Sequence, residues 1–299
     1  GQALQSFRQI EFNGNGNVTF GKNVFHDDGN AFVFNNEADD AKPIEVKFDD
    51  TTDISNNKFI SKNGKVVSSV FINKGTAALA VVTDFGANSS LAAGGNEINF
   101  VLDDGKNVKI SGGSADASGA NFITAQGNKG NLELARADIT INSVGTTKKK
   151  LALLEFTEHA TVKNGTFVTK ATVAAGKKAT VGGTLEGTSY TLGAASELHL
   201  KDGATVKTMV EGNGGEGIVH ISGGVTINKA MGGSGRLEKV IFSDDVKKIA
   251  NLNANISSKN ISLRKGVVKL VNASATLNSL EATTAAATTF DLGTQALTL

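Results

Sequence analysis

Residues 214–221 read Gly-Gly-Glu-Gly-Ile-Val-His-Ile, and residues 232–242 read Gly-Gly-Ser-Gly-Arg-Leu-Glu-Lys-Val-Ile-Phe. In both stretches a Gly-Gly-X-Gly corner is followed by a short run of the kind that forms β-strands. The first corner begins at Gly214 and the second at Gly232. Repetition of a corner and a strand after 18 residues is typical of a solenoid, in which each coil pairs with its two neighbours. The pattern therefore predicts a single parallel β-helix with irregular coils of about 18–25 residues.

Comparable strand-like runs occur along the whole chain, and most of them alternate apolar and polar residues as a strand with one buried face requires. Gly, Asn and Asp separate these runs. Helical periodicity over a dozen residues is hard to find: residues 245–253 and 275–287 are the best candidates, and both lack a convincing cap pair, so we expect an all-β protein. The clearest runs are Asn17–Phe20, Ala31–Phe34, Ile44–Phe48, Val66–Ile72, Ala78–Phe85, Glu97–Leu102, Asn107–Ile110, Asn131–Leu134, Asp138–Ile141, Thr166–Thr169, Glu197–Leu200, Gly217–Ile221, Lys239–Phe242 and Gly266–Val271.

The composition favours the same architecture. The 299 residues include 35 Gly and 28 Asn but only one Pro. Proline removes a donor from a strand ladder, so a chain that consists largely of paired strands avoids it. Glycine and asparagine tolerate positive φ and supply tight corners instead. Two β-sandwich domains joined end to end are the main alternative, although such domains normally use more proline and aromatic corner residues.

Phenylalanine is distributed unevenly, with 12 of the 16 residues before position 150. We expect these side chains to point inward and to stack on successive coils. No linker accompanies the change in composition. We therefore predict one continuous β-helix over residues 1–299, with a Phe-rich core over about 1–125 and an Ala/Thr/Val-rich core over about 150–299.

The charges argue against several classes of function. The chain carries 30 basic and 29 acidic residues, which does not produce the basic field of a nucleic-acid-binding protein.

No apolar run is long enough to cross a membrane as a helix, so direct membrane insertion is not expected. The absence of cysteine excludes disulfides, cysteine-ligated zinc and thiol catalysis. No leader-like segment is present at Gly1, so an exported form would have lost its signal or carry it elsewhere.

Paired aspartates are the strongest hint of catalysis. Some parallel β-helices cleave polysaccharides with paired carboxylates or with carboxylate-bound Ca²⁺. Adjacent side chains on a strand point to opposite faces, however, so one pair cannot form a site alone. We expect these residues to bond local backbone amides at corners, and we predict no catalytic residue and no enzyme activity. The pairs are Asp27-Asp28, Asp39-Asp40, Asp49-Asp50, Asp103-Asp104 and Asp244-Asp245.

Motifs for cofactors and metals are not fulfilled. The Gly-Gly-X-Gly stretches are similar to calcium-binding repeats, but those need Asp where this chain has Val219 and Leu237. A Gly-X-Gly-X-X-Gly match at residues 212–217 precedes a strand-like run and not a helix. His199 and His220 each stand alone on a strand-like run, and we interpret both as exposed side chains. The expectation is that no residue binds a cofactor or a metal.

The stretch Gly232–Phe242, with its glycine corner before a Lys-Val-Ile-Phe strand, resembles passenger domains of type V autotransporters, in particular the rickettsial surface-cell-antigen and outer-membrane-protein group. Residues 256–280, with Asn-Ile-Ser-Leu at 260–263 and Ala-Thr-Leu at 275–277, resemble the coils that follow in that group. The resemblance in detail covers about residues 210–299. It implies a right-handed parallel β-helix, exported through its own outer-membrane β-barrel, which would lie beyond Leu299.

The resemblance also implies a function. Passengers of this group commonly mediate adhesion to host cells and act as virulence factors. This chain is thus expected on the bacterial surface or released from it, with a host-cell surface protein or glycan as its partner. No Arg-Gly-Asp tripeptide is present, so no binding residue can be transferred. A β-helical polysaccharide lyase or hydrolase and a purely structural surface spacer remain the alternatives.

Overall fold

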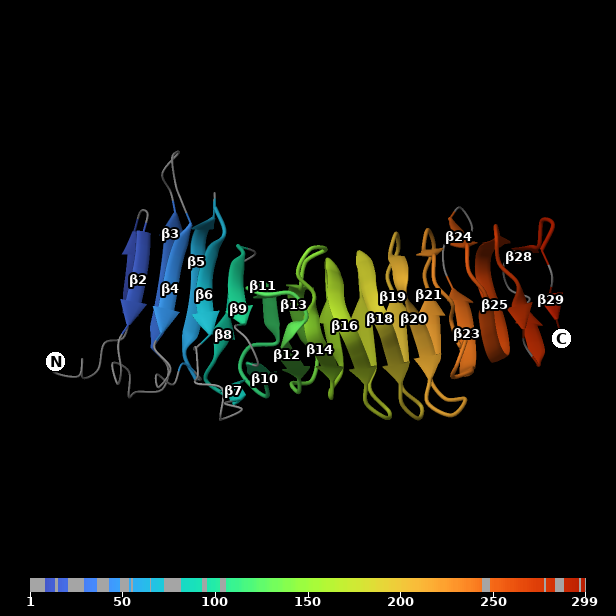
Figure 1. Cartoon of the computed structure of the whole chain (residues 1–299), viewed down its shortest axis with the longest axis horizontal. Coiled ribbons are helices and arrows are strands. Elements are labelled where there is room, and N and C mark those ends of the chain that lie inside the picture. The colour runs from blue at the N-terminus through green and yellow to red at the C-terminus, as the bar shows by residue number, and fades with distance from the viewer. Residues whose placement is uncertain are drawn as a thin grey trace. The chain divides into compact units, whose positions relative to one another are not determined.

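A computed structural model describes residues 9–13, 16–20, 30–36, 43–48, 54, 56–64, 66–72, 82–92, 96–102, 106–243, 248–276, 278–282, 288–295 and 297–298. Within these ranges every regular element is a strand, and parallel strands stack as a β-solenoid (Figure 1). The predicted all-β parallel β-helix is confirmed. No helix in the described ranges has the length and apolar character needed to span a membrane. The chain divides into two compact units, Gly1–Leu154 and Glu155–Leu299, which are described separately.

The first unit contains three rows of parallel strands. One row runs β1–β3–β5–β8, a second runs β2–β4–β6–β9–β11–β13, and a third runs β7–β10–β12. The strands are β1 Gln9–Asn13, β2 Gly16–Phe20, β3 Ala31–Asn36, β4 Ile44–Phe48, β5 Lys58–Gly64, β6 Ser68–Ile72, β7 Val82–Phe85, β8 Ser90–Leu91, β9 Ile98–Leu102, β10 Asn107–Ile110, β11 Asp116–Thr124, β12 Lys129–Leu134 and β13 Ile139–Val144; β14 (Leu151–Phe156) spans the division between the units.

An aromatic ladder fills the interior of this unit, as the sequence predicts. Phe32, Phe59, Phe100 and Phe122 are all fully buried and come from β3, β5, β9 and β11. Neighbouring rings lie 5.2–5.5 Å apart between centroids, in stacked or edge-to-face arrangements. Both arrangements are favourable for aromatic quadrupoles.

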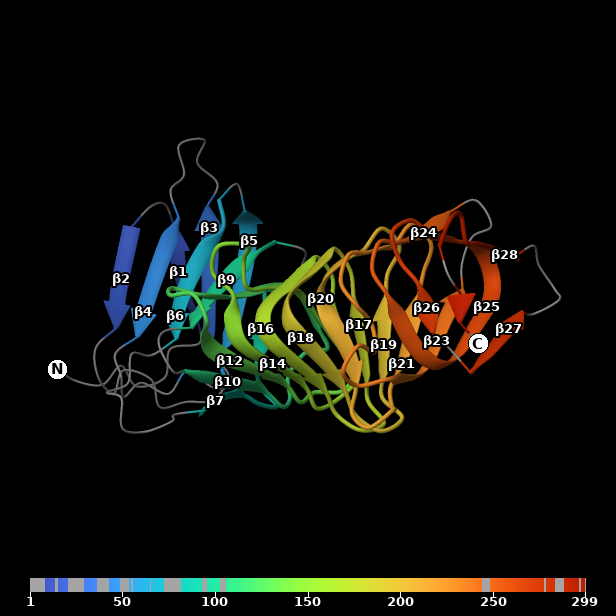
Figure 2. The ribbon, with the colours of Figure 1, turned by 45° about the vertical axis from the view of Figure 1, so that its right-hand side comes forward.

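The second unit also has three rows. The first runs β15–β17–β19–β21–β23–β25–β27. The second runs β16–β18–β20–β22–β24–β25–β28, and the third continues from the ends of β16, β18 and β20 to β26 and β29. Figure 2 shows β16, β18 and β20 side by side. The strands are β15 Ala160–Val162, β16 Gly165–Val173, β17 Lys178–Val181, β18 Thr184–Leu192, β19 Glu197–Leu200, β20 Thr205–Gly212, β21 Ile218–Ile221, β22 Thr226–Ile227, β23 Leu237–Ser243, β24 Ile249–Leu252, β25 Ile256–Leu270, β26 Ala275–Thr276, β27 Ser279–Ala282, β28 Thr288–Asp291 and β29 Leu297–Thr298.

Aliphatic residues dominate the interior of the second unit, because every second residue of a strand points inward. Tyr190 is an exception in its size and polarity. It is fully buried, and its hydroxyl forms a hydrogen bond with the Thr166 hydroxyl. Burial raises the pKa of Tyr190, so the phenol stays protonated.

Coil length differs between the units. In the second unit Gly165 pairs with Thr184, and Thr184 pairs in turn with Thr205. These coils of 19 and 21 residues agree with the predicted coil length of about 18–25 residues. In the first unit Lys58 pairs with Ser90, and this step of 32 residues is longer than predicted.

The Gly-Gly-X-Gly corners at Gly214 and Gly232 lie on consecutive coils. Their glycines do not pair in the register that an alignment of the two sequence repeats would give. Alignment of the corners would place Ile218 opposite Arg236, whereas β21 and β23 pair with Ile218 opposite Lys239. Gly235 lies opposite Gly212, whose amide donates to the Gly235 carbonyl at 2.8 Å. A Cβ atom at Gly235 would lie 2.0 Å from the Gly212 carbonyl oxygen, so the close approach of the two backbones requires glycine.

Candidate functional site

The outward face of β19 and β21 carries a group of three ionisable side chains. Leu198 and Leu200 of β19 are buried, and the alternation of a strand places Glu197 and His199 on the opposite face. The parallel pairing of β19 with β21 then sets His199 directly beside His220. Glu197, His199 and His220 are half-buried and are called the histidine cluster below.

Distances within the histidine cluster are short. His199 Nε2 lies 2.6 Å from Glu197 Oε2, and His220 Nε2 lies 3.5 Å from the same oxygen. The two imidazole rings stack, with centroids 4.0 Å apart and planes inclined by 24°. One donor atom from each of the three side chains lies within 4.8 Å of the other two. A single carboxylate oxygen is therefore shared by two imidazoles from adjacent coils.

The surroundings lower the pKa of two of the three groups, Glu197 and His220. Burial, and secondly the charge of His199, lower the pKa of His220 to about 4. The hydrogen bond from His199 is the main cause that lowers the pKa of Glu197. The neighbouring charges are cationic, with Lys178 acting on Glu197 and Arg264 on His220.

From the sequence, His199 and His220 are expected as separate exposed side chains, whereas the structure brings them into contact. The missing information was the register between coils. His199 and His220 are 21 residues apart, which lies within the predicted coil length of about 18–25 residues. Glu197 precedes His199 on the same face of the same strand. A search for ligand-type residues one coil apart would have found the group.

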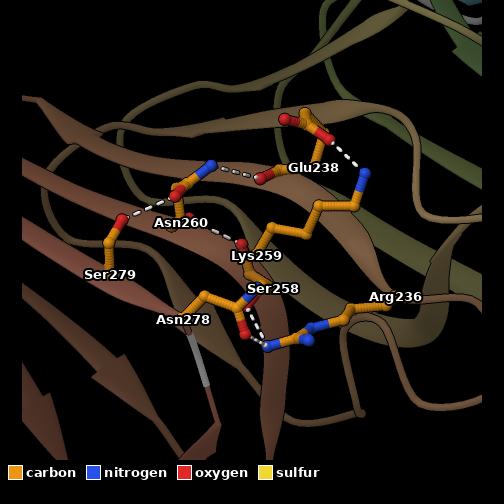
Figure 3. Close-up of polar contacts among 7 residues, drawn as sticks. All are labelled: Arg236, Glu238, Ser258, Lys259, Asn260, Asn278 and Ser279. Atoms are coloured by element: carbon orange, nitrogen blue, oxygen red, sulfur yellow. Dashed lines mark hydrogen bonds and ion pairs between the residues drawn. The ribbon is translucent and has the colours of Figure 1, made fainter. Parts of the chain in front are cut away.

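A second polar surface is formed by residues of β23, β25 and β27 and by the residues directly before β23 and β27, and Figure 3 shows polar contacts among them. Arg236 Nη2 donates to the Ser258 carbonyl at 3.0 Å and to Asn278 Oδ1 at 2.9 Å. Lys259 Nζ donates to Glu238 Oε2 at 2.6 Å. These contacts join three consecutive coils.

The same surface continues through amide and hydroxyl groups. Asn260 Nδ2 donates to the Glu238 carbonyl at 3.4 Å, and Ser279 Oγ donates to Asn260 Oδ1 at 2.5 Å (Figure 3). Lys239 and Glu281 form a further ion pair at 2.9 Å across two coil steps. The residues Arg236, Glu238, Lys239, Ser258, Lys259, Asn260, Asn278, Ser279 and Glu281 are called the polar network below.

Sharing of partners orders the polar network, and every member except the buried Ser258 is at least partly exposed. The side chains of Glu238 and Lys259 remain 44% and 42% exposed although they are paired. Their geometry is held from both sides, because each coil supplies partners to the next. The network therefore offers charged and amide groups to a ligand in a defined arrangement.

All five Asp-Asp pairs considered from the sequence lie outside the residues that the structure describes. The interpretation of these aspartates as corner residues, and the expectation of no catalytic residue, stay predictions. The described structure places the functional-group clusters elsewhere, on the outer faces of consecutive coils.

Comparison with known proteins gave no family model, no curated protein and no solved structure that matches this chain.

Proposed function

We propose that the chain is the passenger of a bacterial surface adhesin, which contacts a host-cell surface protein or glycan through its outward side chains. The observation that carries the proposal is the polar network, in which charged and amide groups of three consecutive coils are held in fixed geometry and remain accessible. A solenoid suits this role because its repeated outer faces form extended binding surfaces.

Fixed side chains favour binding energetically. An ordinary exposed lysine or arginine loses rotamer freedom when a partner immobilises it, at a cost of roughly 0.5–1.5 kcal/mol per side chain. In the polar network Arg236 and Lys259 are already held by partners from adjacent coils. Binding through these groups therefore costs less conformational entropy than binding through isolated surface charges.

The character of the network also indicates the type of partner. Arg236, Lys239 and Lys259 alternate with Glu238 and Glu281, so both signs of charge are interspersed. Such a surface complements a polar protein or glycan with mixed donors and acceptors. It lacks the single-sign basic stripe with which proteins bind nucleic acid.

Attachment of the purified, fluorescently labelled 299-residue chain to cultured mammalian cells tests the proposal. We expect saturable binding that the double substitution Glu238→Gln with Lys259→Gln weakens severalfold, because it removes an ordered ion pair from the network. Glu186→Gln with Lys207→Gln is the matched control, since this pair is separated by 3.9 Å and belongs to other strands of the same unit. Binding by the control should equal that of the wild type.

Two results would contradict the proposal. Absence of binding to every mammalian cell type tested would rule out the proposed adhesive function. Equal loss in the network variant and in the control would show that general surface charge, and not the network, is responsible. The spacer alternative predicts no cell binding by the chain itself, and the polysaccharide-cleaving alternative predicts release of sugar fragments from a polysaccharide substrate.

A further inference from the structure

We propose that Glu197, His199 and His220 together bind one divalent transition-metal ion of the zinc class on the outer face of β19 and β21. The proposal replaces the expectation that the chain has no metal ligand, and it does not depend on the proposed adhesive function. It rests on the donor set, on the distances and on the way in which the strand register fixes the three side chains.

The donor set is selective. Two imidazoles and one carboxylate suit zinc, nickel, copper and cobalt, whereas calcium and magnesium prefer oxygen ligands throughout. Three protein ligands also leave a coordination position open for water or for a donor group of a partner, as in zinc sites that are not purely structural.

One of the separations between the donor atoms already matches what a single ion requires, and a second needs a small adjustment. Zinc–nitrogen and zinc–oxygen bonds of about 2.0–2.1 Å place neighbouring donors of a tetrahedral site roughly 3.3 Å apart. His220 Nε2 and Glu197 Oε2 are 3.5 Å apart and already meet this spacing. His199 Nε2 and Glu197 Oε2 are 2.6 Å apart, so the His199–Glu197 hydrogen bond must open by roughly 0.7 Å when an ion enters.

Reorientation of the rings is the one larger change that binding requires. An ion lies close to the plane of each imidazole that ligates it, and two stacked rings inclined by only 24° cannot both meet that condition. Rotation about the bond between Cβ and the ring is soft for histidine, so the rings can turn toward a common point. The pairing of His199 with His220 meanwhile keeps the two backbones in place.

Two cationic side chains lie near enough to act on the histidine cluster, Lys178 on Glu197 and Arg264 on His220. Their positive charges disfavour a bound cation nearby. Lys178 and Arg264 should therefore lower the affinity of the site for the ion.

Calorimetric titration of Zn²⁺ into the chelator-treated 299-residue chain tests the proposal. We expect binding of one ion per chain, weakened about tenfold or more by each of Glu197→Gln, His199→Asn and His220→Asn. These substitutions keep the polarity of the side chain, and approximately its size, while removing a good ligand. His159→Asn is the matched control, because His159 lies outside the cluster and its Nδ1 accepts a hydrogen bond from the Lys178 amide, which the asparagine oxygen can replace.

Two further measurements keep the test decisive if a variant folds poorly. The imidazole NMR signals of His199 and His220 in the wild-type chain should shift on addition of Zn²⁺, while those of His159 stay unchanged. Cobalt bound in place of zinc should give the visible absorption of a four-coordinate site. Absence of zinc binding by the wild type would overturn the proposal, as would binding that the three ligand variants retain or shifts that appear at His159 instead.

Discussion

Tyr190 and Thr166 show how much one buried polar pair contributes to a solenoid core. Both residues are fully buried, and their hydroxyl groups form a hydrogen bond across adjacent coils. A buried hydroxyl that loses its partner costs about 1–3 kcal/mol, whereas removal of both hydroxyls can be almost neutral. The pair is therefore a sensitive probe of how tightly neighbouring coils are coupled.

Removal of the tyrosine hydroxyl alone should destabilise the protein more than removal of both groups. We expect Tyr190→Phe to lower the free energy of unfolding by about 1–3 kcal/mol because it leaves the Thr166 hydroxyl buried without this partner. The double variant Tyr190→Phe with Thr166→Val should regain most of that loss. Urea unfolding followed by circular dichroism gives the values. Strictly additive effects of the two substitutions would show that the hydroxyls do not interact.

Gly235 supplies a second test at the scale of one residue. Gly235→Ala would place a methyl group 2.0 Å from the Gly212 carbonyl oxygen, so the two coils must separate locally. We expect a loss of about 1–3 kcal/mol, as for other overpacked sites. Gly233→Ala is the control, since its added Cβ atom meets only the Ala230 side chain, at 3.7 Å. Equal stability of the two variants, measured by thermal unfolding, would argue against the close approach.

At the scale of elements, the aromatic ladder of β3, β5, β9 and β11 holds the coils of the first unit together. Phe59 contacts the rings of Phe32, Phe85 and Phe100. Each strand of the ladder therefore depends on its neighbours for a large part of its buried apolar surface. In a repeat protein such interfaces between neighbouring coils dominate stability.

Truncation of the ladder should open the adjacent strands. Phe59→Ala removes a fully buried ring and should cost about 3–5 kcal/mol. Hydrogen exchange should accelerate most for amides of β5 and of its neighbours β3 and β8. Phe71→Ala is the comparison, because Phe71 lies on the outer face of β6 beneath the Lys47 ammonium group and should cost only about 0.5–1 kcal/mol. A similar cost for both substitutions would contradict the assignment of the ladder as the core.

Many of the strands could be predicted from the sequence, but their register could not. Of the expected run Ala78–Phe85, residues 78–81 lie outside the described part of the chain and the remainder forms β7. The expected runs Ile44–Phe48 and Glu197–Leu200 coincide with β4 and β19, because alternation of apolar and polar residues is a local signal. Register depends on which residues of distant segments meet. The equivalence of Gly235 with Gly212, and the contact of His199 with His220, follow from the lengths of the connections and not from the letters of the repeats. The polar network escaped prediction for the same reason.

At the scale of the whole molecule, basic and acidic residues are nearly equal in number, and among the described residues charges of opposite sign pair on outer faces. The chain carries 30 basic and 29 acidic residues. In the second unit several of these residues form ion pairs between coils, as Lys259 does with Glu238. Recognition by such a molecule depends on local geometry, and long-range electrostatic steering should contribute little.

Inserted residues should have effects that depend strongly on their position. One alanine inserted between Leu198 and His199 would reverse the direction of the side chains on one side of the insertion, so that a leucine of β19 would point outward and a polar residue inward. Exposure of a leucine in this way costs about 1.5–3 kcal/mol per side chain. An alanine inserted between Asp202 and Gly203, in an exposed corner, should cost much less. Thermal unfolding of the two variants compares them, and equal loss of stability would show that the corners are as constrained as the strands.

The equivalence of Gly165, Thr184 and Thr205 on successive coils has a consequence for how such a gene can change. Duplication or loss of a segment that spans one whole coil rejoins equivalent backbone positions, and every inward side chain keeps its orientation. Unequal recombination between repeats can thus alter the number of coils without rebuilding the core. Substitutions on the outer face can then diversify independently in each copy, so that length and surface chemistry evolve separately.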